Sequence, residues 1–421
     1  MKKVLLLVLL LAAGVTAFFV WYHPPMRLMP APLVLRGLDR DSLGLGADLA
    51  DGAALEVFYA TSRQPVGPRD GRIYTVVPDD SLHVGTAALR IGDDSTTFDQ
   101  IIDWSTGASG DDRPFVRLTA MREWASVPFA GGDPAAGSDW FAAIDAALAQ
   151  GGDRDILIYV HGANTTVERG VGQAALLHHY SGRNAVVVAF VWPTAENFLR
   201  YLLDVRNAYG SGPQLAALIA ALAERTSAER IHVMTYSAGA TVGSTGLARL
   251  AAEAPAAAAR VGEVLHAAPD ADFRTFVQDA AAYAPLAART TAMVNLGDSA
   301  LRIAQAVTRG SRAGRPDLRE LGAADADWLL GAARAGTLEV VQITPETMDD
   351  LPPGSHTFWY DDPWVSSDVL ATLLAGLPAD RRGLAAASAG AAAGEAPYWT
   401  FPPDYPDFMP ALRANLAGAL R

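Results

Sequence analysis

Short apolar runs alternate with helical stretches from residue 156 to residue 343, and this alternation limits the fold more than any other feature of the sequence. Strands that are apolar along their whole length are typical of sheets covered on both faces. Helical stretches such as Pro213–Arg225 and Leu301–Val307 separate the runs. We therefore predict an α/β fold, a mostly parallel sheet with helices on both faces. The runs are Ile156–Val160, Ala185–Trp192, Ile231–Thr235, Val264–Ala268, Thr291–Leu296 and Leu338–Ile343.

The composition changes along the chain and predicts its organisation. We assign the alternating pattern to a domain at residues 135–377. Residues 51–127 contain shorter alternating runs separated by Gly, Asp and Pro, which indicates a small β-rich N-terminal segment. Residues 23–50 are rich in Pro, Leu and Gly without a clear period, and we interpret them as a tether. Residues 378–421 are an Ala/Gly-rich linker and a Pro/aromatic tail, and we expect the tail to pack against the body.

Residues 1–22 have the pattern of a signal anchor or signal peptide. Lys2 and Lys3 precede an uncharged, mostly apolar run, residues 4–22, whose helical length of about 28 Å matches the hydrocarbon core of a bilayer. The positive end favours the cytoplasm, which predicts an inner-membrane anchor with the rest of the chain on the extracytoplasmic (periplasmic) side. The alternative is cleavage after Val15-Thr16-Ala17, which would give a secreted protein.

The composition excludes several classes of function. A net charge of −13 and an isoelectric point near 5.0 argue against nucleic acid as a partner, because phosphate binding requires a basic surface. The chain has no cysteine, which excludes thiolate catalysis and cysteine-ligated metals. His178 and His179 have no partner ligand one helical turn away, and neither glycine-rich phosphate-binding motif is present. We therefore expect no metal and no cofactor.

A candidate nucleophile lies where an apolar run passes into a helix. Ser237 follows the run Ile231–Thr235, and Ala240–Leu250 is helical and rich in small residues. In α/β-hydrolases such a turn raises a serine hydroxyl above the edge of the sheet. The usual pattern is G-x-S-x-G, with Thr235 here in place of the first glycine. Gly239 and Gly243, one turn apart, allow the helix to approach the strand closely.

The loop after an earlier run is the candidate oxyanion hole. Ile156–Val160 leads directly into His161-Gly162-Ala163. In this fold one oxyanion amide comes from that loop and the other from the residue after the nucleophile. By position these are Ala163 and Ala238. His161 precedes the serine in the chain and lies in this loop, so we expect it to have a structural role.

The candidate base and acid follow the serine in the chain. Of the eight histidines only His266 and His356 come after Ser237, and His266 lies inside an apolar run. His356 lies in a loop after the last run, where this fold delivers its histidine. The acid must hold the other imidazole nitrogen. Asp298 follows the run Thr291–Leu296 and is the first candidate, and Asp270 and Asp272 remain alternatives.

As a set, these pieces resemble the bacterial α/β-hydrolases grouped as domain of unknown function 900. The resemblance covers about residues 155–374, and residues 57–63 resemble the strand that leads into that group's domain. It implies a Ser–Asp–His triad at Ser237, Asp298 and His356 and does not imply a known substrate. The matching pieces are His161-Gly162-Ala163-Asn164-Thr165, Val191-Trp192-Pro193, Tyr236-Ser237-Ala238-Gly239, Ala267-Ala268-Pro269-Asp270, Gly297-Asp298-Ser299-Ala300-Leu301 and Ser355-His356.

We expect a serine hydrolase that cleaves small-molecule or lipid esters through an acyl-enzyme. Trp192-Pro193, at the end of a run, would line the acyl pocket or cap the core. An acyltransferase that uses the same residues is a close alternative. A non-catalytic envelope binding or scaffold protein on a hydrolase fold is an alternative from another class, because fold alone does not fix function.

Overall fold

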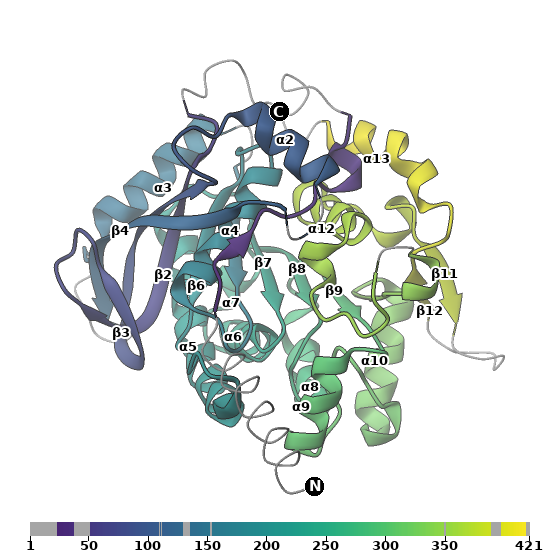
Figure 1. The fold of residues 1–421 in the computed structure, drawn as a ribbon. Coiled ribbons are helices and arrows are strands. Elements are labelled where there is room, and N and C mark those ends of the chain that lie inside the picture. Colours follow the sequence, from purple (N-terminus) through teal and green to yellow (C-terminus); the bar gives the residue numbers. More distant parts are fainter. Residues whose placement is uncertain are drawn as a thin grey trace, which may run out of the picture.

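The apolar runs form the centre of a twelve-stranded sheet. The computed structural model describes residues 23–37, 51–108, 110, 112–128, 135–151, 154–348, 351–388 and 397–417. In spatial order the strands are β1 (Met26–Arg27), β4 (Phe115–Pro128), β3 (Ile73–Ile91), β2 (Ala54–Val66), β6 (Val186–Val191), β5 (Ile156–Val160), β7 (Ile231–Tyr236), β8 (Val261–Ala267), β9 (Arg289–Val294), β10 (Leu338–Gln342), β12 (Pro397–Thr400) and β11 (Ala385–Ser388) (Figure 1).

The central part of the sheet is parallel, as predicted. Every neighbouring pair from β2 across to β12 is parallel, so the carboxyl ends of these strands lie at one edge. All residues of β5, β6 and β8 are buried, because helices cover both faces. The strand order reverses at β5, which lies between β6 and β7. In open α/β sheets the crevice at such a reversal is the usual place for a ligand.

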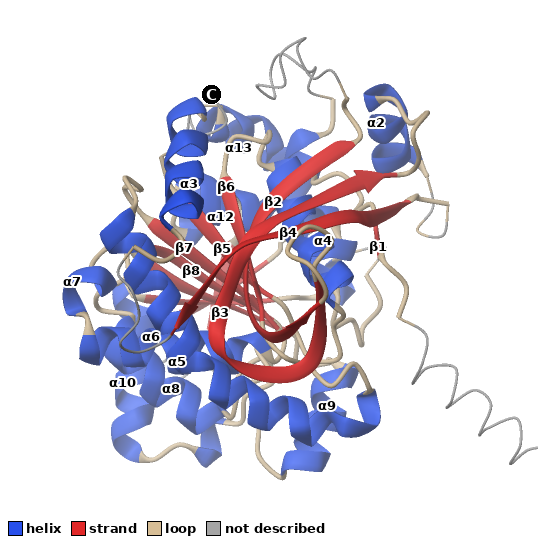
Figure 2. Cartoon of the chain, turned by 90° about the vertical axis from the view of Figure 1, so that its left-hand side faces the viewer, coloured by secondary structure: helices blue, strands red, loops and turns tan. Residues whose placement is uncertain are grey.

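Helices pack on both sides of the sheet (Figure 2). One hydrophobic core joins the sheet to α4 (Val167–Tyr180), α12 (Pro363–Ala375) and α13 (Met409–Leu416). A second core joins the opposite face to α3 (Ser138–Gln150), α5 (Tyr201–Arg225) and α6 (Gly239–Glu253). The other helices are α2 (Phe98–Gly107), α7 (Pro255–Ala258), α8 (Phe273–Tyr283), α9 (Ser299–Thr308), α10 (Ala323–Ala335) and α11 (Phe358–Asp361), with short 3₁₀ turns between some elements.

The β-rich segment predicted at residues 51–127 continues this sheet. β2, β3 and β4 pair antiparallel, and β2 joins the parallel part through β6, with Phe58 opposite Val188. The sequence predicts separate strands at 73–77 and 83–91 because Pro78 and two aspartates lie between them. β3 instead runs through, with Pro78 opposite Arg63 between two register shifts of the β2–β3 ladder. A proline is tolerated at such an irregularity, because a regular ladder hydrogen bond is not required there.

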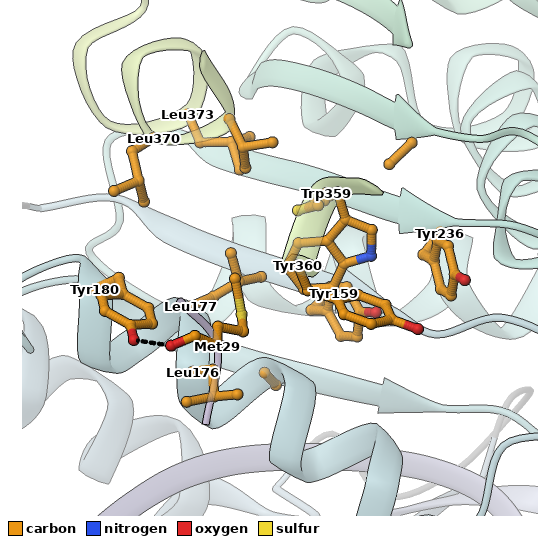
Figure 3. Close-up of a cluster of buried hydrophobic side chains, with 14 of the residues drawn as sticks. Met29, Tyr159, Leu176, Leu177, Tyr180, Tyr236, Trp359, Tyr360, Leu370 and Leu373 are labelled. Carbon is orange, nitrogen blue, oxygen red and sulfur yellow. Dashed lines mark hydrogen bonds between the residues drawn. The ribbon is translucent and has the colours of Figure 1, made fainter. Parts of the chain in front are cut away.

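Residues 23–37, predicted as part of a tether, lie against the body. β1 pairs with β4, and Leu28 and Val34 are fully buried. Tyr180 of α4 donates a hydrogen bond to the carbonyl oxygen of Met29 (2.7 Å), within the cluster of Figure 3. These apolar side chains follow no strand or helix period, so the sequence pattern did not indicate their burial. Residues 38–50 lie outside the described residues.

The predicted membrane segment also lies outside the described residues, because the description begins at residue 23. Among the helices that are described, none is both long enough and apolar enough to cross a bilayer.

The C-terminal tail packs on the body, as the sequence suggested. β12 pairs with β10, and β11, in the predicted Ala/Gly-rich linker, pairs with β12. Tyr405 and Leu412 are fully buried. Arg413 of α13 donates to the carbonyl oxygen of Val34 (2.8 Å). The N-terminal and C-terminal segments therefore contact each other on the same face of the sheet.

Candidate active site

The chain turns sharply between β7 and α6, and Ser237 occupies the turn. β7 ends at Tyr236 and α6 begins at Gly239. Ser237 has a φ of 52°, in the left-handed region that non-glycine residues seldom adopt. Its amide donates to the carbonyl oxygen of Ala267 at the end of β8 (3.0 Å), which holds the turn. Because α6 starts just after the serine, the positive end of the helix dipole lies near its hydroxyl.

Two glycines permit this turn. A Cβ at Gly239 would lie 2.5 Å from the carbonyl oxygens of both Val160 and His161, closer than real carbon atoms approach. A Cβ at Gly243 would collide with the Cγ2 methyl of Thr235. The threonine found where G-x-S-x-G has its first glycine is therefore accommodated by a glycine one turn into the helix.

The structure brings Ser237, His356 and Asp298 into one line of hydrogen bonds. The Nε2 atom of His356 lies 2.8 Å from the Oγ of Ser237. Its Nδ1 lies 2.6 Å from Oδ2 of Asp298, which is fully buried. An Nδ1–H that donates to the carboxylate leaves Nε2 free to accept the hydroxyl proton of the serine. The other oxygen of Asp298 accepts the amide of Leu301 and caps α9 (2.9 Å).

The loop that carries His356 is fixed to the end of β9. Asn295 donates from its Nδ2 to the carbonyl oxygen of Ser355 (2.7 Å), and Ser299 donates to that of Gly354 (2.9 Å). A Cβ at Gly297 would lie 2.5 Å from the carbonyl oxygen of Pro353, so the two loops touch closely. These contacts hold the imidazole beside its carboxylate. Sequence reasoning missed Asn295, whose only signal is its place at the end of a strand.

The alternative acids Asp270 and Asp272 bind other groups. Asp270 accepts from the Nε of Arg312 (2.6 Å) and from the hydroxyl of Tyr201 (2.7 Å). Asp272 caps α8 by accepting the amide of Thr275 (3.1 Å). The structure records no contact from either carboxylate to His356 among the described residues. Asp298 is the acid that the geometry favours.

The other two histidines weighed as bases have structural contacts. His266 is fully buried between Thr235 (2.7 Å) and the hydroxyl of Tyr283 (2.8 Å), and burial lowers its pKa to about 3. His161 stacks on Trp192 with ring centroids 5.4 Å apart. Burial, and then the charge of Arg63, lower the pKa of His161 to about 3. Both imidazoles are therefore neutral parts of the core.

The loop 161–166 lies beside the serine. A Cβ at Gly162 would lie 2.9 Å from the Cβ of Ser237, so this glycine allows the loop to reach the turn. The amides of Ala163 and Ala238 donate no hydrogen bond to the described residues, and Ala163 lines the cavity described below. Trp192 is fully buried and donates to the carbonyl oxygen of His161 (2.7 Å). It supports this loop and does not line the cavity described below.

Two buried ionic side chains that sequence reasoning missed hold the loops in place. Asp204 of α5 accepts the amide of Asn164 with one oxygen (2.8 Å) and that of Ala195 with the other (2.6 Å). Burial raises the pKa of Asp204, and these amides act in the opposite direction. Arg63 of β2 donates to the carbonyl oxygens of Trp192 (3.1 Å) and Thr165 (2.8 Å). Together they connect the loops that follow β5 and β6.

Aromatic side chains that do not line the cavity pack near His356. The ring centroid of Tyr236 lies 5.2 Å from that of His356. Tyr236 also packs edge-on against Trp359 and Tyr360 of α11, at 6.2 and 5.7 Å, and Figure 3 shows the three rings together. These contacts limit the rotation of the imidazole. Tyr236 therefore packs within the aromatic cluster and does not line the cavity described below.

A cavity of about 190 Å³ opens beside the serine. Ser237, Ala163 and His356 line it together with residues of η2 (Phe198–Arg200), α5 and α9, and the α9 side chains among them are all apolar. Its lining residues are Ala163, Asn164, Phe198, Tyr201, Asp204, Ser237, Asp270, Ala300, Leu301, Ile303, Ala304 and His356. The site thus combines a hydroxyl next to a base, two amides with no partner among the described residues, and an apolar pocket. Such a set can activate an oxygen nucleophile and hold a developing oxyanion.

Comparison with known proteins gives one family. A family described as an alpha/beta hydrolase of unknown function (DUF900) matches residues 138–366, which is more than half of the chain. The match includes the turn at Ser237, Asp298 and His356. No curated protein matches the chain.

Proposed function

Because the chain belongs to this family of alpha/beta hydrolases of unknown function, we propose that it is a serine hydrolase that cleaves carboxylic esters. The hydrogen-bonded line from Ser237 through His356 to Asp298 is the observation that carries this proposal. A hydroxyl is a weak nucleophile unless a positioned base takes its proton, and a third group must orient that base. All three are present beside an apolar cavity.

The reaction proceeds in two steps that use the same imidazole. Ser237 Oγ attacks the ester carbonyl carbon while His356 Nε2 takes the hydroxyl proton. His356 then returns this proton to the leaving alkoxide as the carbon–oxygen bond breaks, and an acyl-enzyme remains. Water next gives a proton to His356 and attacks the acyl carbon, and Ser237 leaves with that proton as the acid is released. The amides of Ala163 and Ala238 stabilise the oxyanion in both steps.

The test combines a probe of the serine with a panel of esters. A fluorophosphonate should label the wild-type chain rapidly and leave Ser237→Ala unlabelled. Ser237→Ala should lose about 10⁴–10⁶ in kcat on activated esters, as expected for a nucleophile of this kind, with an unchanged circular dichroism spectrum. Turnover by this variant at the wild-type rate would refute the proposal.

The panel also separates the alternatives. Acyl chains from acetyl to palmitoyl would identify the acyl preference, and added alcohols would reveal transfer to an acceptor other than water. A binding or scaffold protein on the same fold would neither react with the probe nor turn over any ester. A histidine held by a buried carboxylate and directed at a serine hydroxyl has no evident use in such a protein.

We further propose that residues 4–22 anchor the enzyme in the inner membrane with the catalytic domain on the extracytoplasmic side. Lys2 and Lys3 lie before an apolar run of sufficient length, and the positive-inside rule favours this orientation. Secretion after cleavage of a signal peptide is the alternative.

A further inference from the structure

Large apolar side chains are exposed on two sides of the cavity mouth. Phe198 is 49% exposed, and Leu199 and Leu202, which follow it, are 71% and 60% exposed. On α9, Ile303 and Val307 are 50% and 45% exposed and lie one helical turn apart. Phe198 and Ile303 also line the cavity, and the other three lie within about one helical turn of them in the sequence. We call these five residues the mouth rim. Single exposed apolar side chains are common in soluble proteins, but such a group indicates a contact surface.

The exposed charged side chains in the two segments that carry the mouth rim, residues 198–206 and 299–309, are all positive. The segments 198–206 and 299–309 contain four exposed arginines: Arg200, Arg206, Arg302 and Arg309. The one acidic residue in these segments, Asp204, is buried and bound to backbone amides. The whole chain has a net charge of −13, so this local composition differs from that of the rest. Apolar side chains interspersed with arginine are typical of surfaces that enter the headgroup region of an anionic bilayer.

The N-terminal segment enters the described domain next to the mouth rim. The Nε2 of His23 lies 2.8 Å from the carbonyl oxygen of Glu196, two residues before Phe198. Glu196 is itself held by an ion pair with the buried Arg63 (2.5 Å). His23 directly follows the apolar run of residues 4–22. One residue spans less than about 4 Å, so a membrane helix that ended at residue 22 would hold this side of the cavity mouth close to the bilayer.

From these observations we propose that the mouth rim lies in the headgroup region of the anionic membrane that anchors the chain, and that the substrates are acyl esters of lipids in that leaflet. The inference rests on the proposed ester hydrolysis and on the proposed anchor. A lipid ester would move from the bilayer past the apolar rim into the cavity without crossing water. The mouth rim residues of η2, of the start of α5 and of α9 would then face the membrane. Both α5 and α9 lie in the lower part of Figure 1.

The absence of cysteine allows a direct test of the contact. Leu199→Cys and Val307→Cys each introduce a single thiol for an environment-sensitive fluorophore, and neither residue lines the cavity. Leu286→Cys is the matched control, because Leu286 is 38% exposed and precedes the amino end of β9, whereas the cavity lies at the carboxyl ends of the strands. In full-length protein reconstituted into phosphatidylcholine–phosphatidylglycerol vesicles, a nitroxide-labelled lipid should quench both rim labels and spare the control. Equal quenching at all three positions, or none at the rim, would overturn the proposal.

Activity provides a second measurement on the same vesicles. The double variant Leu199→Ser/Leu202→Ser should lose at least about tenfold in turnover of a diacyl lipid in the bilayer and retain the wild-type kcat/KM on a water-soluble acetate ester. Arg200→Gln/Arg302→Gln should reduce the enhancement of lipid turnover by phosphatidylglycerol over pure phosphatidylcholine vesicles. Leu286→Ser should change neither activity. Wild-type lipid turnover in the leucine double variant would contradict the inference.

The two proposals can fail separately. If the soluble ester is hydrolysed but the rim labels stay unquenched and the lipid is not turned over, the ester hydrolase stands and the membrane inference is wrong. If the rim labels are quenched but no ester of either kind is hydrolysed, the rim still contacts the membrane. In that case the proposed chemistry, and the lipid-ester substrate with it, are wrong.

Discussion

Asp298 uses its two carboxylate oxygens for two different partners, and this makes it the most informative single residue of the site. One oxygen caps α9 through the amide of Leu301, and the other accepts from His356. An asparagine can keep the cap by presenting its carbonyl oxygen to that amide. Its NH₂ group then faces His356 and cannot accept the Nδ1 proton. The histidine is therefore forced into the tautomer that carries its proton on Nε2, facing Ser237.

We predict that Asp298→Asn lowers kcat by about 10³–10⁴ at neutral pH, the effect expected of a wrong tautomer. Its melting temperature should stay near that of the wild type, because the cap is retained. Asp270→Asn should affect stability more than chemistry, since Asp270 binds Arg312 and Tyr201. Steady-state kinetics and thermal unfolding of both variants check this. Normal activity in Asp298→Asn together with collapse in Asp270→Asn would assign the acid to the other loop.

His266 gives a second prediction, on the pH dependence of stability. Burial lowers its pKa to about 3 in the folded chain, against an ordinary value near 6.5 when unfolded. The folded state thus binds fewer protons, and the stability contributed by the neutral imidazole is present above pH 6.5 and is lost as the pH falls toward 3. The slope is up to about 1.4 kcal/mol per pH unit.

Denaturant unfolding of wild type and His266→Asn between pH 7 and pH 4 measures this contribution. The variant lacks the titrating group, so its free energy of unfolding should decrease less steeply with acid, although it starts lower because contacts to Thr235 and Tyr283 change. Carboxylates titrate in both proteins and cancel in the comparison. Parallel curves would show that His266 is protonated equally in the folded and unfolded states.

The residues that the sequence made predictable lie at the ends of strands, whereas those that it did not predict bind the backbone of loops remote in sequence. Ser237, Asp298 and His356 follow β7, β9 and β10, and the parallel pairing of these strands with their neighbours brings their carboxyl ends to one edge of the sheet. Arg63 and Asp204 act on the backbone of loops that are remote in sequence, and Arg63 is 102 positions from Thr165. No local pattern records which carbonyl or amide such a side chain will meet.

At the scale of elements, a strand was predictable where both its faces are buried. β5, β6 and β8 are apolar throughout for that reason. β11 is a run of three alanines and a serine, and its pairing with β12 makes it a strand. Nothing in such a sequence distinguishes it from a linker, since its side chains carry no alternation. The predicted and unpredicted strands therefore differ in burial more than in backbone geometry.

The contact between α6 and β7 leads to a prediction about both elements. Gly243→Ala should push α6 away from β7, because the new Cβ collides with Cγ2 of Thr235. The expected cost is about 1–3 kcal/mol, as for an overpacked core, with a fall in kcat as the turn at Ser237 shifts. Thr235→Ser removes the methyl and keeps the hydroxyl that contacts His266. In the Gly243→Ala background it should restore most of the stability and the activity.

A matched control and a double-mutant cycle make this test specific. Gly331→Ala, at an exposed helical position in α10 with nothing near its Cβ, should stabilise the protein by about 0.5–1 kcal/mol. Additive effects of Gly243→Ala and Thr235→Ser in denaturant unfolding would mean that the two residues do not determine the distance between helix and strand.

At the scale of the whole molecule, the two terminal segments close the same face of the sheet. The carbonyl oxygen of Val34 accepts a hydrogen bond from Arg413 of α13, and its amide donates to the hydroxyl oxygen of Ser367 in α12 (3.0 Å). Pro/Leu-rich and Pro/aromatic segments without a period look alike whether they are free or packed. Their burial depends on a groove formed by distant parts of the chain. The body therefore extends from residue 23 to the tail, and this fixes where a membrane anchor would join it.

This junction makes the topology of the full-length chain testable. If residues 4–22 span the inner membrane with Lys2 and Lys3 inside, protease added to intact spheroplasts should digest the domain that begins at residue 23. A cytoplasmic protein in the same cells should remain intact and serves as the control for lysis. Protection in intact spheroplasts, with digestion only after lysis, would show that the domain lies on the cytoplasmic side and that the proposed orientation is wrong.

The mass of the membrane-extracted protein then distinguishes the anchor from a cleaved signal peptide. A retained anchor predicts the intact N-terminus, whereas cleavage after Val15-Thr16-Ala17 predicts a chain that begins at Phe18. The proposed membrane contact of the mouth rim leads to a further expectation about the activity of the anchored and the released enzyme. With the anchor intact, His23 holds the membrane-proximal end of the chain against Glu196, and lipid-ester turnover should exceed that of the same enzyme released by a protease site inserted after residue 22. Both forms should hydrolyse the soluble acetate ester equally, because Ser237, His356 and Asp298 all lie far beyond the cut. A released enzyme that matches the anchored one on lipid would show that the anchor determines only location.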